Sequence, residues 1–362
     1  MKKFYLSLFF MLCSIFVSAQ ALHNNPLKTR LDTVVHQAAL AYLKDNNRVG
    51  FSLGFIANKN RHQYHYGETA PGSGVLPSST SIYEIGSITK TFTGVLVAHA
   101  VKEGKMDLKA DIRNYLPGNF PNIQYPNGDP VKLIYVLAHV AMFPNSFVDD
   151  PTGKPTTEAY FLDQLHQVKL DSLKEFKYAY SNVGYQLVGY MLENIYKMSF
   201  DELVQKYIAK PLRMTHTKVS YPLLDQPQLL KGFNATKTES KSISASFPAA
   251  GALRSTLPDM LNYLNYQMEA KDSVVKFTHK ITSGDIDKGA HGIQWAIGKL
   301  WNWDYYLQTD GGTYGFRSFC MIYPDDQLSF IVLSNQTDNN AGGGLYRVTA
   351  AIYNELMKRN RK

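Results

Sequence analysis

YEIGSITKTF, residues 83–92, places a serine and a lysine three positions apart among apolar side chains. Residues three apart on a helix share one face, so the Lys90 amine would lie one turn from the Ser87 hydroxyl. A serine becomes a strong nucleophile only when a base takes its proton. Apolar surroundings lower the pKa of a lysine and let it accept such a proton. The stretch therefore predicts an activated nucleophile at the start of a helix that runs from Ser87 to about Glu103.

This pattern also has a purely structural interpretation. Ser-x-x-Lys is short, and Ser273 and Lys276 repeat it in a polar segment. Ser87 could simply cap a buried helix. The spacing alone leaves both interpretations open.

Two further patterns lie downstream of the Ser-x-x-Lys pair. Tyr180 and Asn182, in YAYSN, stand at an expected loop-to-helix junction before an amphipathic segment. TDGGTYGF begins at Thr309, just after an expected strand, and its glycines would let a substrate approach the strand edge. Each pattern is weak alone, since Tyr180 could be a half-buried aromatic residue and the glycines could form an ordinary turn.

The order of strand and helix patterns indicates an α/β (α+β) fold. Strand patterns lie at both ends of the chain, with helical segments between them, so we expect a mainly antiparallel sheet that is built from N- and C-terminal segments and flanked by helices. The expected sheet domain comprises residues 27–105 and 241–357. Residues 106–240 would form a helical insertion domain, with the active site between the two. The expected strands are VGFSLGFIAN, HQYHYGET, GIQWAIGKLW, DYYLQT, GFRSFCMIYP and LSFIVLSNQ.

Taken together, the three patterns resemble the motifs of the penicillin-recognising serine hydrolases. The resemblance is to the β-lactamase-related group that contains class C β-lactamases, D,D-carboxypeptidases, esterases and D-aminopeptidases, where the middle motif is Tyr-x-Asn. It extends from about residue 27 to residue 357. Three longer blocks carry it: YEIGSITKTFTGVLVAHAVKEGKMDLKADIRNYLP, YSNVGYQLVGYMLENIYKMSFDEL and PAAGALRSTLPDML.

The resemblance implies catalytic roles for three residues. Ser87 would attack an acyl carbonyl, while Lys90 and Tyr180 would share the work of taking and returning the proton. The backbone N–H groups of Ser87 and Gly312 would form an oxyanion hole. Water would then hydrolyse the acyl-enzyme.

The resemblance also implies where the substrate binds. Asn182 would hold the amide side of the substrate. The substrate would lie along the edge that contains Thr309, Asp310, Gly311 and Gly312.

The third motif departs from the family pattern in its charge. The family has Lys or His where this chain has Thr309, and the next residue is Asp310. A cation at this position would bind the carboxylate of a β-lactam or of a peptide C-terminus. Thr309 cannot do so, although Arg317 or Lys299 could substitute. Without that cation, we expect Tyr180 to stay protonated at neutral pH.

A second family block also departs from its usual form. The family sequence LLTHTSGLP appears here as VLAHVAMFP, which keeps His139 but loses the small polar residues. The family motif gives this histidine no proton-transfer role. We therefore expect His139 to be structural.

Three functional interpretations follow from these departures. The first, which we favour, is a serine hydrolase that acts through an acyl-enzyme on Ser87, on an ester or amide without a strongly anionic group. The second is a β-lactamase or D,D-carboxypeptidase whose cation comes from elsewhere. The third is a non-catalytic protein that keeps the fold and binds cell wall or a partner. Retention of Ser87, Lys90, Tyr180 and Asn182 together argues against the third.

The N-terminus has the pattern of a secretory signal peptide, expected at residues 1–21. A basic start precedes an apolar run of about 14 residues and a small-residue exit, VSAQA. Cleavage would follow Ala19 or Ala21. A membrane anchor is the alternative, but the run is short of the roughly 20 residues that span a bilayer. We expect a periplasmic or secreted protein with no stable membrane span after cleavage.

The composition limits the classes of partner and cofactor that we expect. The chain has 38 Lys and Arg against 30 Asp and Glu, and these charges are scattered, so we expect no nucleic-acid partner. Its histidines show no ligand spacing, and we expect no metal and no other cofactor. The expected substrate is a small molecule or a peptidoglycan-type compound. The oligomeric state stays open.

Overall fold

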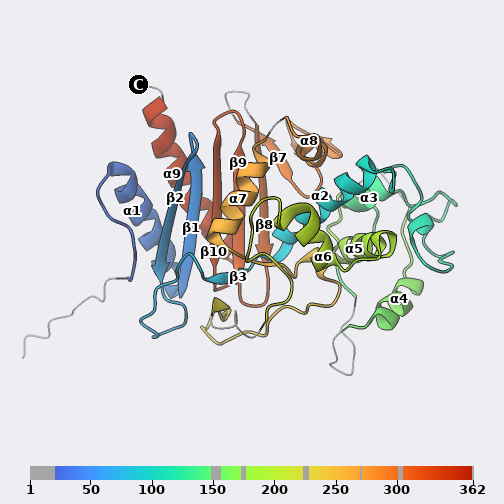
Figure 1. Cartoon of the computed structure of the whole chain (residues 1–362), viewed down its shortest axis with the longest axis horizontal. Helices are drawn as coiled ribbons and strands as arrows, with labels where there is room; N and C mark the ends of the chain where they lie inside the picture. Colours follow the sequence, from blue (N-terminus) through green and yellow to red (C-terminus); the bar gives the residue numbers. More distant parts are fainter. Residues whose placement is uncertain are drawn as a thin grey trace, which may run out of the picture.

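An antiparallel sheet of eight strands forms the centre of the fold (Figure 1). The computed structural model describes residues 21–147, 156–172, 177–222, 228–269, 271–300 and 305–360. The strand order is β2-β1-β10-β9-β8-β7-β6-β5. The strands are β1 (Gly50–Ala57), β2 (Asn60–Gly67), β5 (Ser283–Asp285), β6 (Gly289–His291), β7 (Ala296–Lys299), β8 (Tyr305–Gly312), β9 (Arg317–Tyr323) and β10 (Leu328–Ser334).

The sheet joins strands from opposite ends of the chain. β1 pairs with β10 over its length, with Leu53 opposite Val332. Both strands are buried almost throughout and apolar on both faces, which suits central strands that are covered by helices on each side. The expectation of an antiparallel sheet built from N- and C-terminal segments is confirmed.

Helices cover both faces of the sheet. α1 (Arg30–Lys44) and α9 (Ala341–Asn360) lie together on one face, where Val35 and Leu345 are buried with Phe330 of β10. α7 (Leu257–Gln267) packs on the other face against β1 and β10. At Gly54 of β1, a Cβ would lie 3.0 Å from a methyl group of Leu257. The absence of a side chain there lets α7 approach the sheet closely.

The remaining helices gather beside the β5 end of the sheet (Figure 1). The fully or nearly buried α2 packs against α5 and α8. Residues 106–240 contribute α3 to α6, and within the described part of that segment there is no strand of the large sheet. Their separation as an insertion domain stays a prediction. The helices are α2 (Thr89–Lys102), α3 (Leu133–Leu137), α4 (Glu158–His166), α5 (Asn182–Tyr196), α6 (Phe200–Val204) and α8 (Ser273–His279).

Some local elements differ from the sequence-based expectation. Ser87 lies in a 3₁₀ turn, Gly86–Ile88, that precedes α2, so it does not open the α-helix itself. The TDGG segment belongs to β8 because it continues the pairing with β9. The polar segment that begins at Ser273 forms α8. Short strands without a clear pattern were also missed, namely β3 (Ile82–Glu84), β4 (Arg254–Thr256), β5 and β6.

The N-terminal prediction is not addressed by the fold. The expected signal peptide lies outside the described residues, except for Ala21. Among the helices that the structure describes, none combines the length and the apolar character needed to cross a bilayer.

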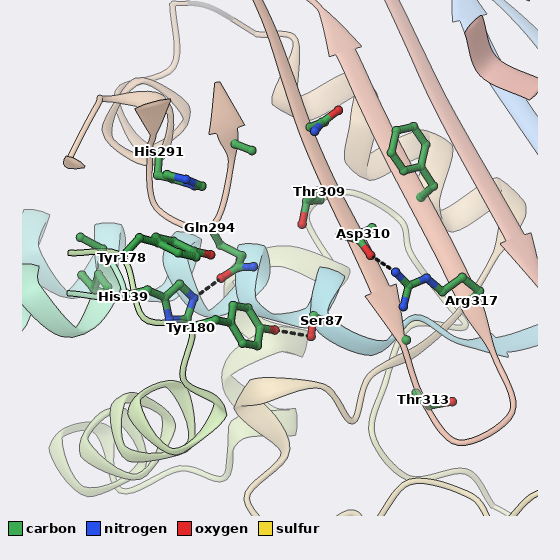
Figure 2. A pocket seen from close by; sticks show the side chains of 17 residues that line it. Ser87, His139, Tyr178, Tyr180, His291, Gln294, Thr309, Asp310, Thr313 and Arg317 are labelled. Carbon is green, nitrogen blue, oxygen red and sulfur yellow. Dashed lines mark hydrogen bonds and ion pairs between the residues drawn. The ribbon is translucent and has the colours of Figure 1, made fainter. Parts of the chain in front are cut away.

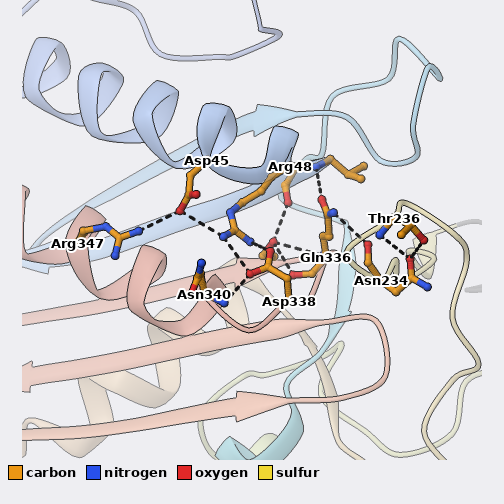
Figure 3. Close-up of polar contacts among 11 residues, drawn as sticks. Asp45, Arg48, Asn234, Thr236, Gln336, Asp338, Asn340 and Arg347 are labelled. Carbon is orange, nitrogen blue, oxygen red and sulfur yellow. Dashed lines mark hydrogen bonds and ion pairs between the residues drawn. The ribbon is translucent and has the colours of Figure 1, made fainter.

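A buried ion pair fixes the loop that leads into α9 (Figure 3). The side chain of Arg48 is inaccessible to solvent and pairs with Asp338, whose side chain is only 4% exposed. Asp45 lies 3.5 Å from the same guanidinium. The neighbouring Gln336 accepts a hydrogen bond from the amide of Val49 at 2.7 Å. These contacts tie the end of α1 to the segment between β10 and α9.

We expect Asp338→Asn to lower the free energy of unfolding by about 3 kcal/mol, because it leaves the buried Arg48 charge largely uncompensated. Urea denaturation measures this change. The control is Glu239→Gln, which breaks the exposed Lys231–Glu239 pair and should cost less than about 1 kcal/mol. Equal effects of the two variants would contradict the special role of the buried pair.

Candidate active site

The turn that carries Ser87 lies against the end of β8. Gly86 has φ +53°, a left-handed conformation that glycine adopts without strain. A Cβ at residue 86 would lie 2.6 Å from the amide nitrogen of Gly312, and a Cβ at residue 311 would lie 2.1 Å from the carbonyl oxygen of Ile85. Ser318 of β9 donates a hydrogen bond to that carbonyl at 2.8 Å. The two backbones meet this closely only because both positions are glycine.

Four predicted site residues meet within hydrogen-bonding distance. Ser87 Oγ lies 2.6 Å from the Tyr180 hydroxyl and 3.0 Å from Lys90 Nζ (Figure 2 draws the first contact). Nζ also lies 2.7 Å from Asn182 Oδ1 and 2.5 Å from the carbonyl oxygen of Ala250. Tyr180 is in the loop before α5 and Asn182 is the first residue of that helix, as predicted. Three segments that are distant in the sequence thus meet around Ser87 Oγ and Lys90 Nζ.

Burial lowers the pKa of Lys90 well below its usual 10.5. The side chain is entirely buried in the core, and desolvation penalises its charged form. The carboxylate of Asp310 acts in the opposite direction and raises this pKa. The amine therefore becomes available as a proton acceptor at a lower pH than an exposed lysine would.

Burial also raises the pKa of Tyr180 to about 12. The hydrogen bond with Ser87 lowers this pKa, the charge of Asp310 raises it, and Arg317 lowers it slightly. The phenol thus stays protonated at neutral pH, as the sequence led us to expect. The main cause is desolvation, however, and not only the missing cation of the third motif.

His139 fixes the loop that carries Tyr180. Its carbonyl oxygen accepts a hydrogen bond from Ala179 N at 2.7 Å, and its Nδ1 accepts one from Ser181 N at 3.1 Å. Its ring stacks on that of Tyr180, with the centroids 4.6 Å apart. Because Nδ1 accepts, Nε2 carries the proton and donates to Gln294 Oε1 at 2.8 Å. Burial lowers the pKa of His139 to about 4, so the ring is neutral.

Both residues of the His139–Gln294 hydrogen bond have a strained backbone. His139 has φ +55° and Gln294 has φ +66°. Residues other than glycine adopt such values rarely, and they cluster where tertiary contacts impose a position. These contacts support the expectation that His139 is structural, which stays a prediction. The sequence did not indicate that His139 would hold Tyr180 in position.

A cavity of about 530 Å³ opens in front of Ser87. Figure 2 shows its walls: one contains His139, Tyr178 and Tyr180, and the opposite one contains β8 with Asp310. Its lining residues are Ser87, Leu137, Ala138, His139, Tyr178, Tyr180, His291, Gly292, Gln294, Ala296, Gln308, Thr309, Asp310, Gly312, Thr313, Arg317 and Phe319.

Not every predicted site residue reaches this cavity. Ser87, Tyr180, Thr309, Asp310 and Gly312 line it. Lys90, Asn182 and Gly311 do not, since Lys90 lies behind Ser87 and the side-chain amide of Asn182 donates to Asn145 Oδ1 at 3.0 Å. Direct contact of Asn182 with substrate stays a prediction.

The cavity also contains residues that the sequence analysis missed. Tyr178 stacks on His291 with the ring centroids 4.3 Å apart, and these rings extend the aromatic wall beyond Tyr180. Tyr178 is two residues from the Tyr-x-Asn motif, which was the only available signal. His291 is the last residue of the short strand β6, which the sequence did not indicate. Gln294 lies within the expected strand GIQWAIGKLW but precedes β7, and nothing in the sequence placed it at the cavity.

The cavity's two charged side chains form a pair. Arg317 Nη2 lies 2.5 Å from Asp310 Oδ2 (Figure 2). Arg317 thus supplies a cation near the position where the family has Lys or His. Lys299, the other candidate, pairs with Asp287 and does not line the cavity. Within the described ranges, no three His, Cys, Asp or Glu side chains are grouped as metal ligands.

The fold is that of β-lactamase-related proteins. The Beta-lactamase family model matches residues 35–353. The structure is similar to a class C β-lactamase from Rhodobacter sphaeroides, with a TM-score of 0.78 and 18% identity over 90% of this chain and 99% of the other. The structure is also similar to a β-lactamase/D-alanine carboxypeptidase from Pseudomonas syringae. The TM-score is 0.78 and the identity is 19%, over 90% of this chain and 99% of the other.

The chain belongs to the β-lactamase family of serine hydrolases. It is 26% identical to Protein flp of Staphylococcus aureus (strain MRSA252) over 86% of this chain, but it spans only 64% of that relative's length. It is 24% identical to a β-lactamase of Providencia stuartii over 81% of this chain and 84% of the other. The resemblance seen in the sequence motifs is confirmed at the level of family and fold.

We expect His139→Asn to slow the reaction of Ser87 with a fluorophosphonate probe by about tenfold, since small displacements of a reacting group are costly. Asparagine tolerates positive φ, but it loses the ring contact with Tyr180. Probe incorporation followed by mass spectrometry measures the rate constant.

A matched pair elsewhere in the chain provides the control. His279 lies 2.8 Å from Gln267 Oε1, and burial likewise lowers the pKa of His279 to about 4, but neither residue lines the cavity. His279→Asn should affect stability and leave the labelling rate unchanged. Equal slowing by both variants would contradict a specific role of His139.

Proposed function

We propose that this protein is a serine hydrolase that forms an acyl-enzyme on Ser87. The observation that carries this proposal is the convergence of Lys90 and Tyr180 on Ser87 Oγ, at 3.0 and 2.6 Å, at the edge of a cavity that a small molecule can enter. A nucleophile within reach of two proton-transfer groups is the arrangement that acyl transfer needs.

Hydrogen-bond counting assigns the base. An uncharged amine has two N–H donors and one lone pair. The carbonyl oxygens of Asn182 and Ala250 can only accept, so they take both donors. The lone pair then faces the Ser87 hydroxyl, which donates to it. Lys90 in its uncharged form is therefore the group that removes the serine proton.

Tyr180 is the complementary acid. Its phenol stays protonated, with a pKa of about 12, and donates to Ser87 Oγ. On acylation, Ser87 Oγ forms the bond to the acyl carbon as its proton passes to Lys90 Nζ. The carbonyl electrons move onto the oxygen that lies against the N–H groups of Ser87 and Gly312. When they return, the bond to the leaving group breaks, and that group takes a proton from Tyr180, which regains one through Lys90.

Water completes the cycle by the same route. It adds to the acyl carbon with Lys90 as the base, and the bond to Ser87 Oγ breaks. The acid is released and Ser87 is protonated again. No step requires a metal or a cofactor.

The charge of the cavity favours uncharged substrates. Asp310 and Arg317 neutralise one another, and Lys90 and His139 have lowered pKa values that favour their uncharged forms. Thr309, at the family's cationic position, is 6% exposed and carries no charge. An ester or amide without an anionic group fits this environment.

A β-lactamase or D,D-carboxypeptidase activity is the second candidate. It is favoured by the presence of Arg317 in the cavity wall, where it could bind a substrate carboxylate. It is disfavoured because Asp310 already occupies that guanidinium. Periplasmic or secreted localisation remains a prediction from residues 1–21.

We expect turnover of a p-nitrophenyl acyl ester to exceed that of a chromogenic cephalosporin, because the cephalosporin carboxylate meets Asp310. Absorbance assays of the two substrates measure kcat/KM. Ser87→Ala should abolish both activities and the fluorophosphonate adduct. Faster cephalosporin hydrolysis would contradict the substrate assignment. An absence of turnover and of adduct would favour a non-catalytic binding protein.

The pH dependence tests the identity of the base. Since Lys90 acts when uncharged, kcat/KM should rise with pH through the lowered pKa of Lys90 and reach a plateau below pH 10.5. The plateau should persist until Tyr180 ionises near pH 12. Lys90→Arg should remove the activity because arginine keeps its proton. A rise centred at or above pH 10.5 would contradict this assignment.

A further inference from the structure

We propose that Arg317 forms a latent carboxylate-binding subsite and that Asp310 masks it. The inference rests on the proposed function of Ser87 and deepens it. Asp310 would determine substrate specificity by acting as an internal substitute for a substrate carboxylate. Removing that carboxylate should redirect the enzyme towards anionic substrates without any new cation being introduced.

Strand register places the two charges on the same face of the sheet. Gly312 of β8 is paired with Arg317 of β9, and Asp310 lies two residues before Gly312. Residues two apart on a strand face the same side, so Asp310 is the diagonal neighbour of Arg317. Both side chains line the cavity.

The guanidinium is held in a slot between two glycines. A Cβ at Gly312 would lie 2.7 Å from Arg317 Nη1, and a Cβ at Gly342 of α9 would lie 2.9 Å from Nη2. Any larger residue at either position would displace the guanidinium. Arg317 Nε is buried and has no hydrogen-bond partner among the described residues. The slot therefore fixes the cation through shape, and not through a network of acceptors.

Asp310 is the side chain that pairs with the Arg317 guanidinium, and this ion pair is weak. Among the described residues, the guanidinium makes one side-chain hydrogen bond, from Nη2 to Asp310 Oδ2. The side chains of Arg317 and Asp310 are 31% and 52% exposed. Solvent screens such a pair. A carboxylate that arrived in the cavity could exchange with Asp310, but it would also be repelled by it.

The slot is close enough to the reacting serine to select substrates. Gly312 lies between the Ser87 turn and the Arg317 guanidinium. Its amide nitrogen lies against Gly86, the residue before Ser87, and its Cα faces Arg317 Nη1. A substrate bound with its carbonyl oxygen at the Gly312 amide would thus have its neighbouring groups beside the guanidinium. Arg317 can bind a carboxylate on the substrate only when Asp310 releases it.

The experiment compares two esters with the same leaving group: the monoester of succinic acid with p-nitrophenol, which carries a carboxylate, and p-nitrophenyl butyrate, which is uncharged. The measured quantity is the ratio of kcat/KM for the anionic ester to that for the neutral one. Asp310→Asn should raise this ratio about tenfold, because one repulsion is removed and one attraction is gained at a half-exposed site. The neutral ester corrects for general damage to the active site.

A double-mutant cycle identifies the group responsible. Arg317→Gln should lower the ratio below that of the wild type, because Asp310 is then unpaired. The double variant Asp310→Asn, Arg317→Gln should return the ratio towards the wild-type value. If Asp310→Asn raised the ratio equally in the absence of Arg317, the latent subsite would be refuted.

The matched control is Glu239→Gln, which removes a carboxylate of similar exposure, 53%, from the Lys231–Glu239 pair outside the cavity. This variant should leave the ratio unchanged. Binding of phenylboronic acid and of 3-carboxyphenylboronic acid to each variant, measured by calorimetry, gives the same comparison without turnover.

The two proposals fail in different ways. An active wild-type enzyme whose ratio does not rise in Asp310→Asn would overturn the masking role of Asp310 and leave the hydrolase in place. A wild-type protein that hydrolyses neither ester and binds neither boronic acid would overturn the proposed function, and the latent subsite with it.

Discussion

The burial of one amine governs the chemistry that we propose for this site. Lys90 is enclosed by α2, by the start of α5 and by the Ala250 carbonyl, and the cost of desolvating its charge keeps its pKa low. The same surroundings present two acceptors, which in the proposed mechanism orient the uncharged amine so that its lone pair meets Ser87. Three separate segments must be in place at once for this to occur. The packing of the helices against the sheet is thus also the step that lowers the pKa of Lys90, the base of the proposed mechanism.

Two different devices position the groups around that amine. Glycines at residues 86 and 311 let the turn that carries Ser87 and the end of β8 approach each other without side chains between them. His139 and Gln294 instead hold the Tyr180 loop through hydrogen bonds and ring stacking. The glycines act because they have no side chains, whereas His139 and Gln294 act through directed contacts. Together they fix Ser87 relative to Tyr180 from opposite sides of the cavity.

The sequence predicted best what depends on local spacing. The proximity of Ser87 and Lys90 follows from the helical repeat, and the position of Tyr180 and Asn182 at a helix start follows from the amphipathic segment after them. The meeting of these two groups could be expected only from the resemblance to a family. The pairing of Asp310 with Arg317 depends on the register of β8 and β9, which no local pattern specifies. β6 is only three residues long, and Gln294 lies in the segment between β6 and β7, so neither His291 nor Gln294 could be assigned to the cavity.

The pairing of β1 with β10 has a consequence for how the protein is made. The first long strand emerges early from the ribosome, but its central partner is among the last segments to be synthesised. Until then, the apolar edge of β1 has only β2 beside it. Such long-range pairing makes folding slow and leaves an unpaired edge exposed to other chains. The newly made polypeptide is therefore most vulnerable to aggregation before its C-terminal strands appear, and a chaperone that shields β1 during that interval would raise the yield of folded protein.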